Sequence, residues 1–203
     1  MKIFCVGRNY VEHAKELGND VPDEPVIFLK PKSAFLQPHM PFYYPEFTNE
    51  LHYEAELVLR VSKNGKYIQD RHASKYYNAF TVGIDFTARD LQQQLKEKGL
   101  PWEISKAWDN SAAVGKFIDI KPGMNLGNIN FCLYKNKEMV QQANSSQMIF
   151  TFDQIVSYVS QFFSLNIGDL IFTGTPVGVG ECVVGDILEG FIEDDSLLEV
   201  EVK

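Results

Sequence analysis

The segment 51–61 reads LHYEAELVLRV and constrains the fold more than any other part of the chain. Side chains two residues apart in a β-strand point to the same side, so Glu54 and Glu56 would project together. The opposite side would carry an apolar stripe, formed by Leu51, Tyr53, Ala55, Leu57, Leu59 and Val61. We therefore predict one continuous strand over 51–61, with its apolar face packed on a core.

Short strand-like runs recur along the chain, whereas helical patterns are few. The runs lie at 3–6, 26–29, 79–85, 129–134, 137–141, 170–173, 186–189 and 198–202. Helical spacing is found at 10–17 and 88–98, and a capping-box sequence at Thr151 opens a third helix. The pair Asn64-Gly65 suits a tight hairpin turn after the first long strand. This pattern predicts a β-rich α+β fold, such as a rolled sheet or a barrel.

Length, charge and cysteine usage narrow the class of protein. The chain has 203 residues and no dividing linker, which predicts a single domain over 1–203. Its formal net charge of −8 argues against nucleic acid or an anionic membrane surface as the partner. Three widely spaced cysteines argue against a disulfide framework or a zinc ribbon. The apolar run at 3–6 is too short for a signal peptide, so we expect a cytoplasmic location.

Three carboxylates are candidate metal ligands. Two carboxylates held side by side repel each other unless they are exposed, share a proton or share a cation. Asp85 closes the apolar strand 79–85, so it can join Glu54 and Glu56 in space. Three carboxylate groups without a Cys or His partner suit a hard cation such as Mg²⁺ or Mn²⁺. On spacing alone, a charged and solvated strand face remains the alternative.

His13 and Glu16 are a candidate general-base pair. They lie three residues apart, so they share one face of the predicted helix 10–17. A carboxylate bound to an imidazole fixes its tautomer and stabilises the imidazolium, as catalysis by a histidine base requires. Ordinary mixed charge on a surface helix explains the same spacing.

Further residues have the chemistry to bind an anion. Lys106 sits among apolar residues, where it can stabilise an enolate or merely extend its ammonium to solvent. Arg89 and Gln92 are three apart on the helix after Asp85, and a guanidinium beside an amide suits a carboxylate. The glycine-rich loop 172–180 offers backbone N–H groups and the Thr175 hydroxyl. A tight turn between strands is the alternative reading of that loop.

Six segments that carry these residues also occur in a recognisable order. They are GRNYVEHAKE at 7–16, PVIFLK at 25–30, HYEAEL at 52–57, GIDFTARD at 83–90, KAWD at 106–109 and TGTPVGVG at 173–180. Together they resemble the fumarylacetoacetate hydrolase family, and most closely its short acylpyruvase and oxaloacetate decarboxylase branch. The resemblance extends over nearly the whole chain.

The resemblance implies a mixed β-sandwich roll that forms a homodimer. It also implies roles for nine residues. The metal ligands for Mg²⁺ or Mn²⁺ would be Glu54, Glu56 and Asp85; the catalytic residues His13, Glu16 and Lys106; and the substrate-binding residues Arg89, Gln92 and Thr175. Residues at about 7–20, which carry the His13–Glu16 dyad, would form a mobile lid over the site.

The reaction implied is metal-dependent hydrolysis of acylpyruvates such as acetylpyruvate or fumarylpyruvate. The bond between C3 and C4 breaks and leaves a pyruvate enolate that the metal stabilises. Decarboxylation of oxaloacetate would be a second reaction of the same site. The alternatives are an oxaloacetate decarboxylase or tautomerase, a 2-hydroxyhepta-2,4-diene-1,7-dioate isomerase, and a non-catalytic protein that binds 2-oxo acids. No motif identifies the acyl group distal to the pyruvate moiety.

Overall fold

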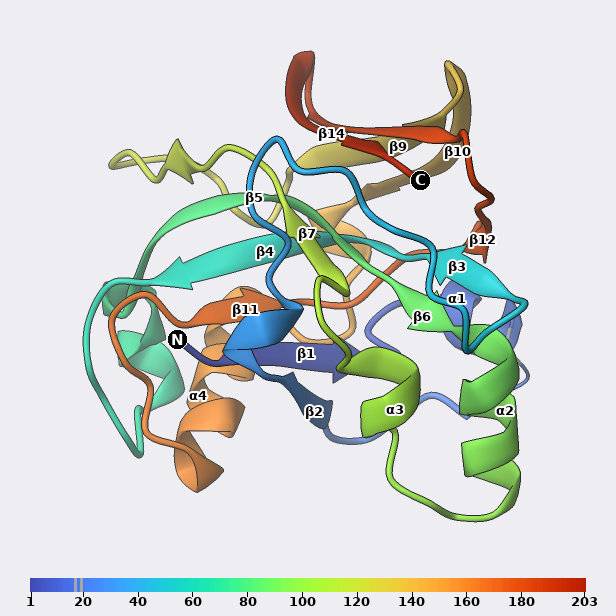
Figure 1. The fold of residues 1–203 in the computed structure, drawn as a ribbon. Coiled ribbons are helices and arrows are strands. Elements are labelled where there is room, and N and C mark those ends of the chain that lie inside the picture. The colour runs from blue at the N-terminus through green and yellow to red at the C-terminus, as the bar shows by residue number, and fades with distance from the viewer. Residues whose placement is uncertain (17, 19) are drawn as a thin grey trace.

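The computed structural model describes residues 1–16, 18 and 20–203 and consists mainly of β-sheets (Figure 1). The strands are β1 (Ile3–Gly7), β2 (Val26–Lys30), β3 (Leu51–Tyr53), β4 (Ala55–Val61), β5 (Tyr77–Asp85), β6 (Thr87–Ala88), β7 (Ala112–Val114), β8 (Ile118–Asp119), β9 (Asn130–Lys135), β10 (Glu138–Asn144), β11 (Leu170–Phe172), β12 (Gly180–Glu181), β13 (Ile187–Ile192) and β14 (Asp195–Glu201). The α-helices are α1 (Val11–Glu16), α2 (Arg89–Glu97), α3 (Glu103–Lys106) and α4 (Phe152–Phe162). Short 3-10 turns are η1 (Lys32–Ala34), η2 (Asp70–Lys75) and η3 (Ser145–Gln147).

The strands form three sheets. The largest has the order β2-β1-β11-β4-β5-β7, with β8 also paired to β5. A four-stranded sheet has the order β10-β9-β13-β14, and a small sheet has the order β12-β3-β6. This architecture confirms the predicted β-rich α+β fold and the curled sheets expected of the fumarylacetoacetate hydrolase fold.

The main core lies between the seven-stranded and the four-stranded sheets, which form two layers in Figure 1. Leu57 and Val82 from the larger sheet belong to the same buried cluster as Leu133 and Leu188 from the smaller sheet. Gly190 allows the close approach, because a Cβ there would lie only 2.8 Å from a methyl group of Val82. A second cluster covers the other face of the large sheet. Both faces of β4 are therefore buried.

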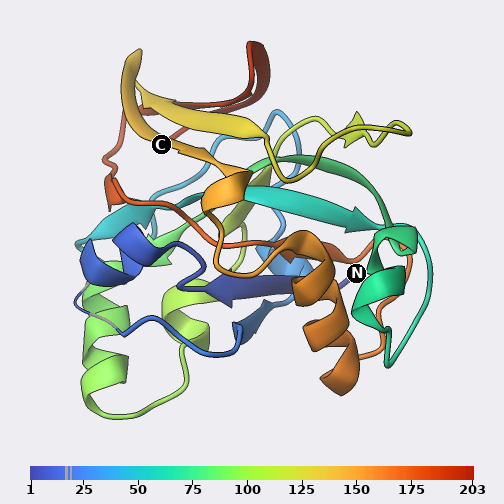
Figure 2. The same cartoon turned by 180° about the vertical axis from the view of Figure 1, so that it is seen from behind.

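In the reverse view of Figure 2, α4 lies against the large sheet, whereas α1 and α2 lie at one end of the sheets. The capping box predicted at Thr151 is confirmed, because its hydroxyl accepts from the Gln154 N–H and the Gln154 side chain accepts from the Thr151 N–H. The helix expected at 10–17 is found as α1, although Leu17 and Asn19 lie outside the described residues. No helix in the described part of the chain is long and apolar enough to cross a membrane.

Two local predictions are wrong. The strand expected over 51–61 breaks at Glu54, where the chain passes from the small sheet into the large one. The Asn64-Gly65 pair is not a tight hairpin turn, because residues 62–76 join β4 to β5 through η2. Gly65 instead exchanges two backbone hydrogen bonds with Leu165, a partner one hundred residues away that local turn chemistry does not reveal.

Candidate active site

The pairing of β4 with β5 brings the three predicted metal ligands together. In this antiparallel register Glu56 lies opposite Gly83, and the Asp85 N–H donates to the Glu54 carbonyl at 2.9 Å. Only glycine fits opposite Glu56, since a Cβ at Gly83 would lie 2.7 Å from a methyl group of Val58. The carboxylates thus converge where β4 begins and β5 ends.

The carboxylates form a compact and buried cluster. One oxygen from each of Glu54, Glu56 and Asp85 lies within 4.8 Å of the others. Their exposed fractions are 6%, 2% and 0%, so the alternative of a solvated, charged strand face is wrong. Buried carboxylates require compensation by cations or hydrogen bonds.

Two lysines compensate Asp85 and Glu54. The Lys106 ammonium lies 2.7 Å from Asp85 Oδ2 and 2.8 Å from Glu54 Oε2, and it donates to the Thr87 hydroxyl. On the far side of Asp85, the Lys30 ammonium lies 2.6 Å from Oδ1 and is anchored by the backbone and side-chain oxygens of Ser111. Burial alone would lower the pKa of Lys106, but the charges of Asp85 and Glu54 outweigh it and raise that pKa.

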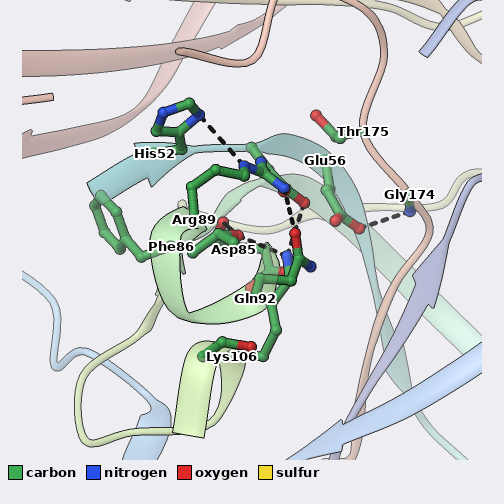
Figure 3. A network of polar contacts seen from close by, with 12 residues as sticks. His52, Glu56, Asp85, Phe86, Arg89, Gln92, Lys106, Gly174 and Thr175 are labelled. Atoms are coloured by element: carbon green, nitrogen blue, oxygen red, sulfur yellow. Dashed lines mark hydrogen bonds and ion pairs between the residues drawn. The ribbon is translucent and has the colours of Figure 1, made fainter. Parts of the chain in front are cut away.

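The start of α2 adds a third cation (Figure 3). The Arg89 guanidinium lies 2.6 Å from Glu54 Oε1 and also donates to the Gln92 side-chain oxygen at 2.5 Å. Although burial opposes it, the charges of Lys106 and Arg89 lower the pKa of Glu54 strongly. His52 accepts from Arg89 at 3.4 Å, and burial followed by the Arg89 charge lowers its pKa to about 4. His52 therefore stays neutral, and its unprotonated Nδ1 can accept the hydrogen bond from Arg89.

Glu56 differs from the other two carboxylates because none of the described cationic side chains forms an ion pair with it. Its one hydrogen bond comes from the Gly174 N–H, at 2.6 Å (Figure 3). Burial, and then the charges of Asp85 and Glu54, raise the pKa of Glu56 well above its usual value. A divalent cation between the three carboxylates would remove this repulsion. The donor set therefore fits Mg²⁺ or Mn²⁺.

The glycine-rich loop that follows β11 is tied to the carboxylate cluster. Gly174 adopts φ +103°, which directs its N–H to Glu56 and leaves no room for a side chain, because a Cβ would meet Asn9 at 2.6 Å. The Thr175 hydroxyl accepts from Gln141 Nε2 at 2.9 Å, while Gln141 Oε1 accepts from the Ala55 N–H at 2.9 Å. Gln141 thus joins the strand that carries the glutamates to the predicted substrate-binding threonine.

The predicted base pair is also present. His13 Nδ1 lies 3.1 Å from Glu16 Oε2, and Glu16 Oε1 accepts from the Gly178 N–H at 3.1 Å. His13 is 4% exposed, so the alternative of an ordinary surface helix is wrong for this side chain. With its proton on Nδ1, His13 keeps Nε2 free to accept a proton.

One pocket unites the predicted residues. Its lining includes His13, Glu54, Glu56, Asp85, Arg89, Gln92, Lys106 and Thr175. Glu16 is the exception: it does not line the pocket, but it contacts His13, which does. The free volume of this pocket is only about 30 Å³, which is enough for water but not for a larger molecule.

Residue patterns had assigned no role to several side chains that contact or line this site. Lys30 belongs to the PVIFLK segment, which signals the family but not the ion pair with Asp85. Gln141 has no signal in the sequence, because a β-bulge between Met139 and Gln141 accompanies its inward position. Arg8 and Lys96 also line the pocket, and only the folded chain brings them there.

Comparison with known proteins agrees with this geometry. The family model described as fumarylacetoacetate (FAA) hydrolase C-terminal matches residues 2–203. The chain is 38% identical to a mitochondrial oxaloacetate tautomerase of Mus musculus, over 99% of this chain and 91% of that protein. It is 39% identical to a mitochondrial oxaloacetate decarboxylase of Dictyostelium discoideum, over 93% and 87% respectively.

A solved structure with the same fold contains a metal. Fumarylpyruvate hydrolase from Pseudomonas aeruginosa, in complex with Mn²⁺ and pyruvate, superposes with a TM-score of 0.93 at 38% identity. The match covers 100% of this chain and 89% of that one. The sequence match, the shared fold and the buried carboxylate cluster lead to one conclusion: the chain belongs to the fumarylacetoacetate hydrolase family.

Proposed function

We propose that this protein is a Mg²⁺- or Mn²⁺-dependent enzyme that hydrolyses acylpyruvates. Water adds to the C4 carbonyl, the bond between C3 and C4 breaks, and the products are a carboxylic acid and pyruvate. The observation that carries this proposal is the convergence of a histidine base, a metal-type carboxylate cluster and anion-binding side chains on one pocket. A non-catalytic 2-oxo acid binder would not require a buried His13 held by Glu16.

The dyad would activate the water. His13 Nε2 takes a proton from water while Glu16, fixed by the Gly178 N–H, stabilises the imidazolium. After the bond breaks, the same imidazolium returns a proton to C3 of the departing pyruvate. This transfer restores the neutral histidine for the next cycle.

The opposite wall would hold the pyruvate moiety. Arg89 and Gln92 orient the substrate carboxylate, and the Thr175 hydroxyl donates to an oxo oxygen. Lys106 places a buried positive charge where negative charge develops during cleavage. A bound Mg²⁺ or Mn²⁺ supplies Lewis-acid stabilisation of the same developing enolate charge.

Oxaloacetate decarboxylation or tautomerisation is a second candidate function. Two relatives that match over nearly the whole chain carry those names. Both reactions need the same enolate chemistry, and neither needs an activated water. We propose that this site supports them beside hydrolysis.

A substrate panel tests both candidates. Purified protein is assayed with acetylpyruvate, fumarylpyruvate and oxaloacetate, with Mg²⁺ or Mn²⁺ and again with excess chelator. Nuclear magnetic resonance follows pyruvate and acid release, and absorbance follows the enol of oxaloacetate. We expect metal-dependent turnover of at least one acylpyruvate. Rates equal to the chelated control for all three compounds would refute the proposal.

We also propose that residues 1–203 act as one catalytic domain and that the segment at about 7–20, in which Leu17 and Asn19 lie outside the described residues, moves as a lid. A pocket of about 30 Å³ cannot admit a 2-oxo acid unless part of its wall opens. The short α1 contributes His13 to that wall. The homodimer and the cytoplasmic location stay predictions from the sequence; light scattering of the purified protein tests the first, and fractionation of the source cells tests the second.

A further inference from the structure

Two cationic side chains line the pocket away from the carboxylate cluster. Arg8 stands at the start of the segment that leads into α1, and its backbone adopts φ 62°. Lys96 lies in the last turn of α2, with its ammonium 5.8 Å from the centre of the Trp102 ring. Both side chains are only partly exposed.

Neither cation is neutralised within the described part of the chain. Arg8 and Lys96 form no ion pair there, in contrast to Arg89 and Lys106 in the same pocket. Burial, followed by the charges of Arg89 and Arg8, lowers the pKa of Lys96. Like charges that face one small pocket repel each other unless an anion lies between them.

The charge balance of the pocket favours a dianion. Lys30, Arg89 and Lys106 already match the three carboxylates in number. A divalent metal ion would make the metal end positive, and Arg8 and Lys96 make the remaining wall positive as well. A ligand with a carboxylate at each end would place a negative charge against each of these positive regions.

The spacing along α2 separates the two ends. Arg89, Gln92 and Lys96 follow at intervals of three and four residues, so they lie on one face of the helix. Lys96 is two turns beyond Arg89, roughly 10 Å along the axis. Phe28 and Trp102, which also line the pocket, pack edge to face with their centres 5.9 Å apart. They offer an apolar wall for the carbon chain of a ligand.

We propose that Arg8 and Lys96 form a subsite for a second carboxylate, so that the protein prefers dicarboxylic 2-oxo acids to monocarboxylic ones. The subsite rests on the proposed function, because the metal end must hold the first carboxylate and the 2-oxo group. It assigns the group distal to the pyruvate moiety, which would be acidic, as in fumarylpyruvate, rather than a plain acyl chain.

Titration calorimetry with two unreactive probes tests this subsite. 2-Oxoadipate and 2-oxohexanoate have the same number of carbons, and a carboxylate replaces a methyl group at the far end. Neither has an oxo group at C4, so neither can be cleaved. We expect the Mg²⁺-loaded wild type to bind 2-oxoadipate at least about tenfold more tightly. The preference should fall to less than about threefold in Lys96→Met and in Arg8→Met.

Two further variants separate this role from structural damage. Lys96→Arg keeps the charge and should keep the preference. Lys98→Met removes an exposed lysine next to the same helix end and should leave the preference as in wild type. The subsite is refuted if the wild type binds both probes equally or binds neither, or if Lys96→Met and Arg8→Met retain the full preference. A clear preference without turnover of any acylpyruvate would instead count against the proposed hydrolase alone.

Discussion

The floor and the cover of the pocket are built in different ways. The floor consists of Glu54, Glu56 and Asp85 at the ends of β4 and β5, where backbone pairing in a buried sheet sets every position. The cover is α1, a six-residue helix that carries the His13–Glu16 dyad. Helices this short are unstable on their own, so α1 depends on the contacts that hold it.

Few hydrogen bonds join α1 to the rest of the described chain. Glu16 reaches the Gly178 N–H at 3.1 Å, and Tyr10 forms a single β-bridge with Met148 just before the helix. The pair between Lys15 and Glu12 is exposed and adds little. The difference teaches that a preorganised floor is suited to bind the metal and the substrate, whereas the cover would supply the proposed proton transfer. Changes in the two regions should therefore separate binding from chemistry.

The largest effect is expected from Glu56→Ala in the floor. Loss of one of the three proposed metal ligands should abolish tight binding of Mg²⁺ and lower turnover by about a thousandfold or more. The fold should persist, because the substitution removes a charge that has no cationic partner among the described residues. Calorimetry measures metal affinity and circular dichroism the fold, with Glu199→Ala on β14 as an exposed control. Wild-type affinity for Mg²⁺ in Glu56→Ala would show that the floor is not a metal site.

A smaller loss, confined to chemistry, is expected from His13→Ala in the cover. Hydrolysis of an acylpyruvate should fall by roughly 10²–10⁴-fold, since a general base of this kind contributes that much. Affinity for Mg²⁺ should stay within about threefold of wild type, because His13 is not in the carboxylate cluster. Glu12→Ala, which removes an exposed acid from the same helix, is the control. A parallel loss of metal affinity would mean that floor and cover are not independent.

The same contrast explains what the sequence could predict. Alternation over 51–61 and the apolar run ending at Asp85 marked the floor carboxylates as candidates, because each signal is local, but the family resemblance was needed to prefer a metal site to a solvated strand face. The break at Glu54 was missed because it depends on a change of sheet, which no local pattern reports. Lys30 and Gln141 were not assigned for a related reason. They reach Asp85 and Thr175 through contacts between residues far apart in the chain.

Gln141 connects β4, next to the floor carboxylates, to the Thr175 loop, so Gln141→Met should have a moderate effect on substrate binding. Because Gln141 already donates to the Thr175 hydroxyl, the threonine proton is available to a substrate oxygen. Loss of this donor should raise KM about tenfold with little change in kcat. Thr175→Val should behave alike, and the double variant should be no worse than either single one. Additive losses in steady-state kinetics would show that Gln141 acts on something other than Thr175.

The last comparison concerns stability, on which substitutions at two floor positions should have effects of opposite sign. In the metal-free protein the folded state raises the pKa of Glu56 above its unfolded value, so stability falls as pH rises through that interval. Glu56→Gln removes this penalty and should add about 1–3 kcal/mol at neutral pH, and nothing below about pH 3, where the carboxyl is protonated in both states. The new amide oxygen can still accept from the Gly174 N–H.

Asp85→Asn is the matched variant with the opposite sign. Its carboxylate is already paired with Lys30 and Lys106, and removing its charge leaves the buried Lys30 ammonium without its ion-pair partner and Lys106 with Glu54 alone. We expect a loss of about 3–5 kcal/mol in the free energy of unfolding, measured by urea titration in chelator. If Glu56→Gln also destabilised the chelated protein at neutral pH, Glu56 would be compensated like Asp85, and the case for a cation at the floor would lose its electrostatic basis.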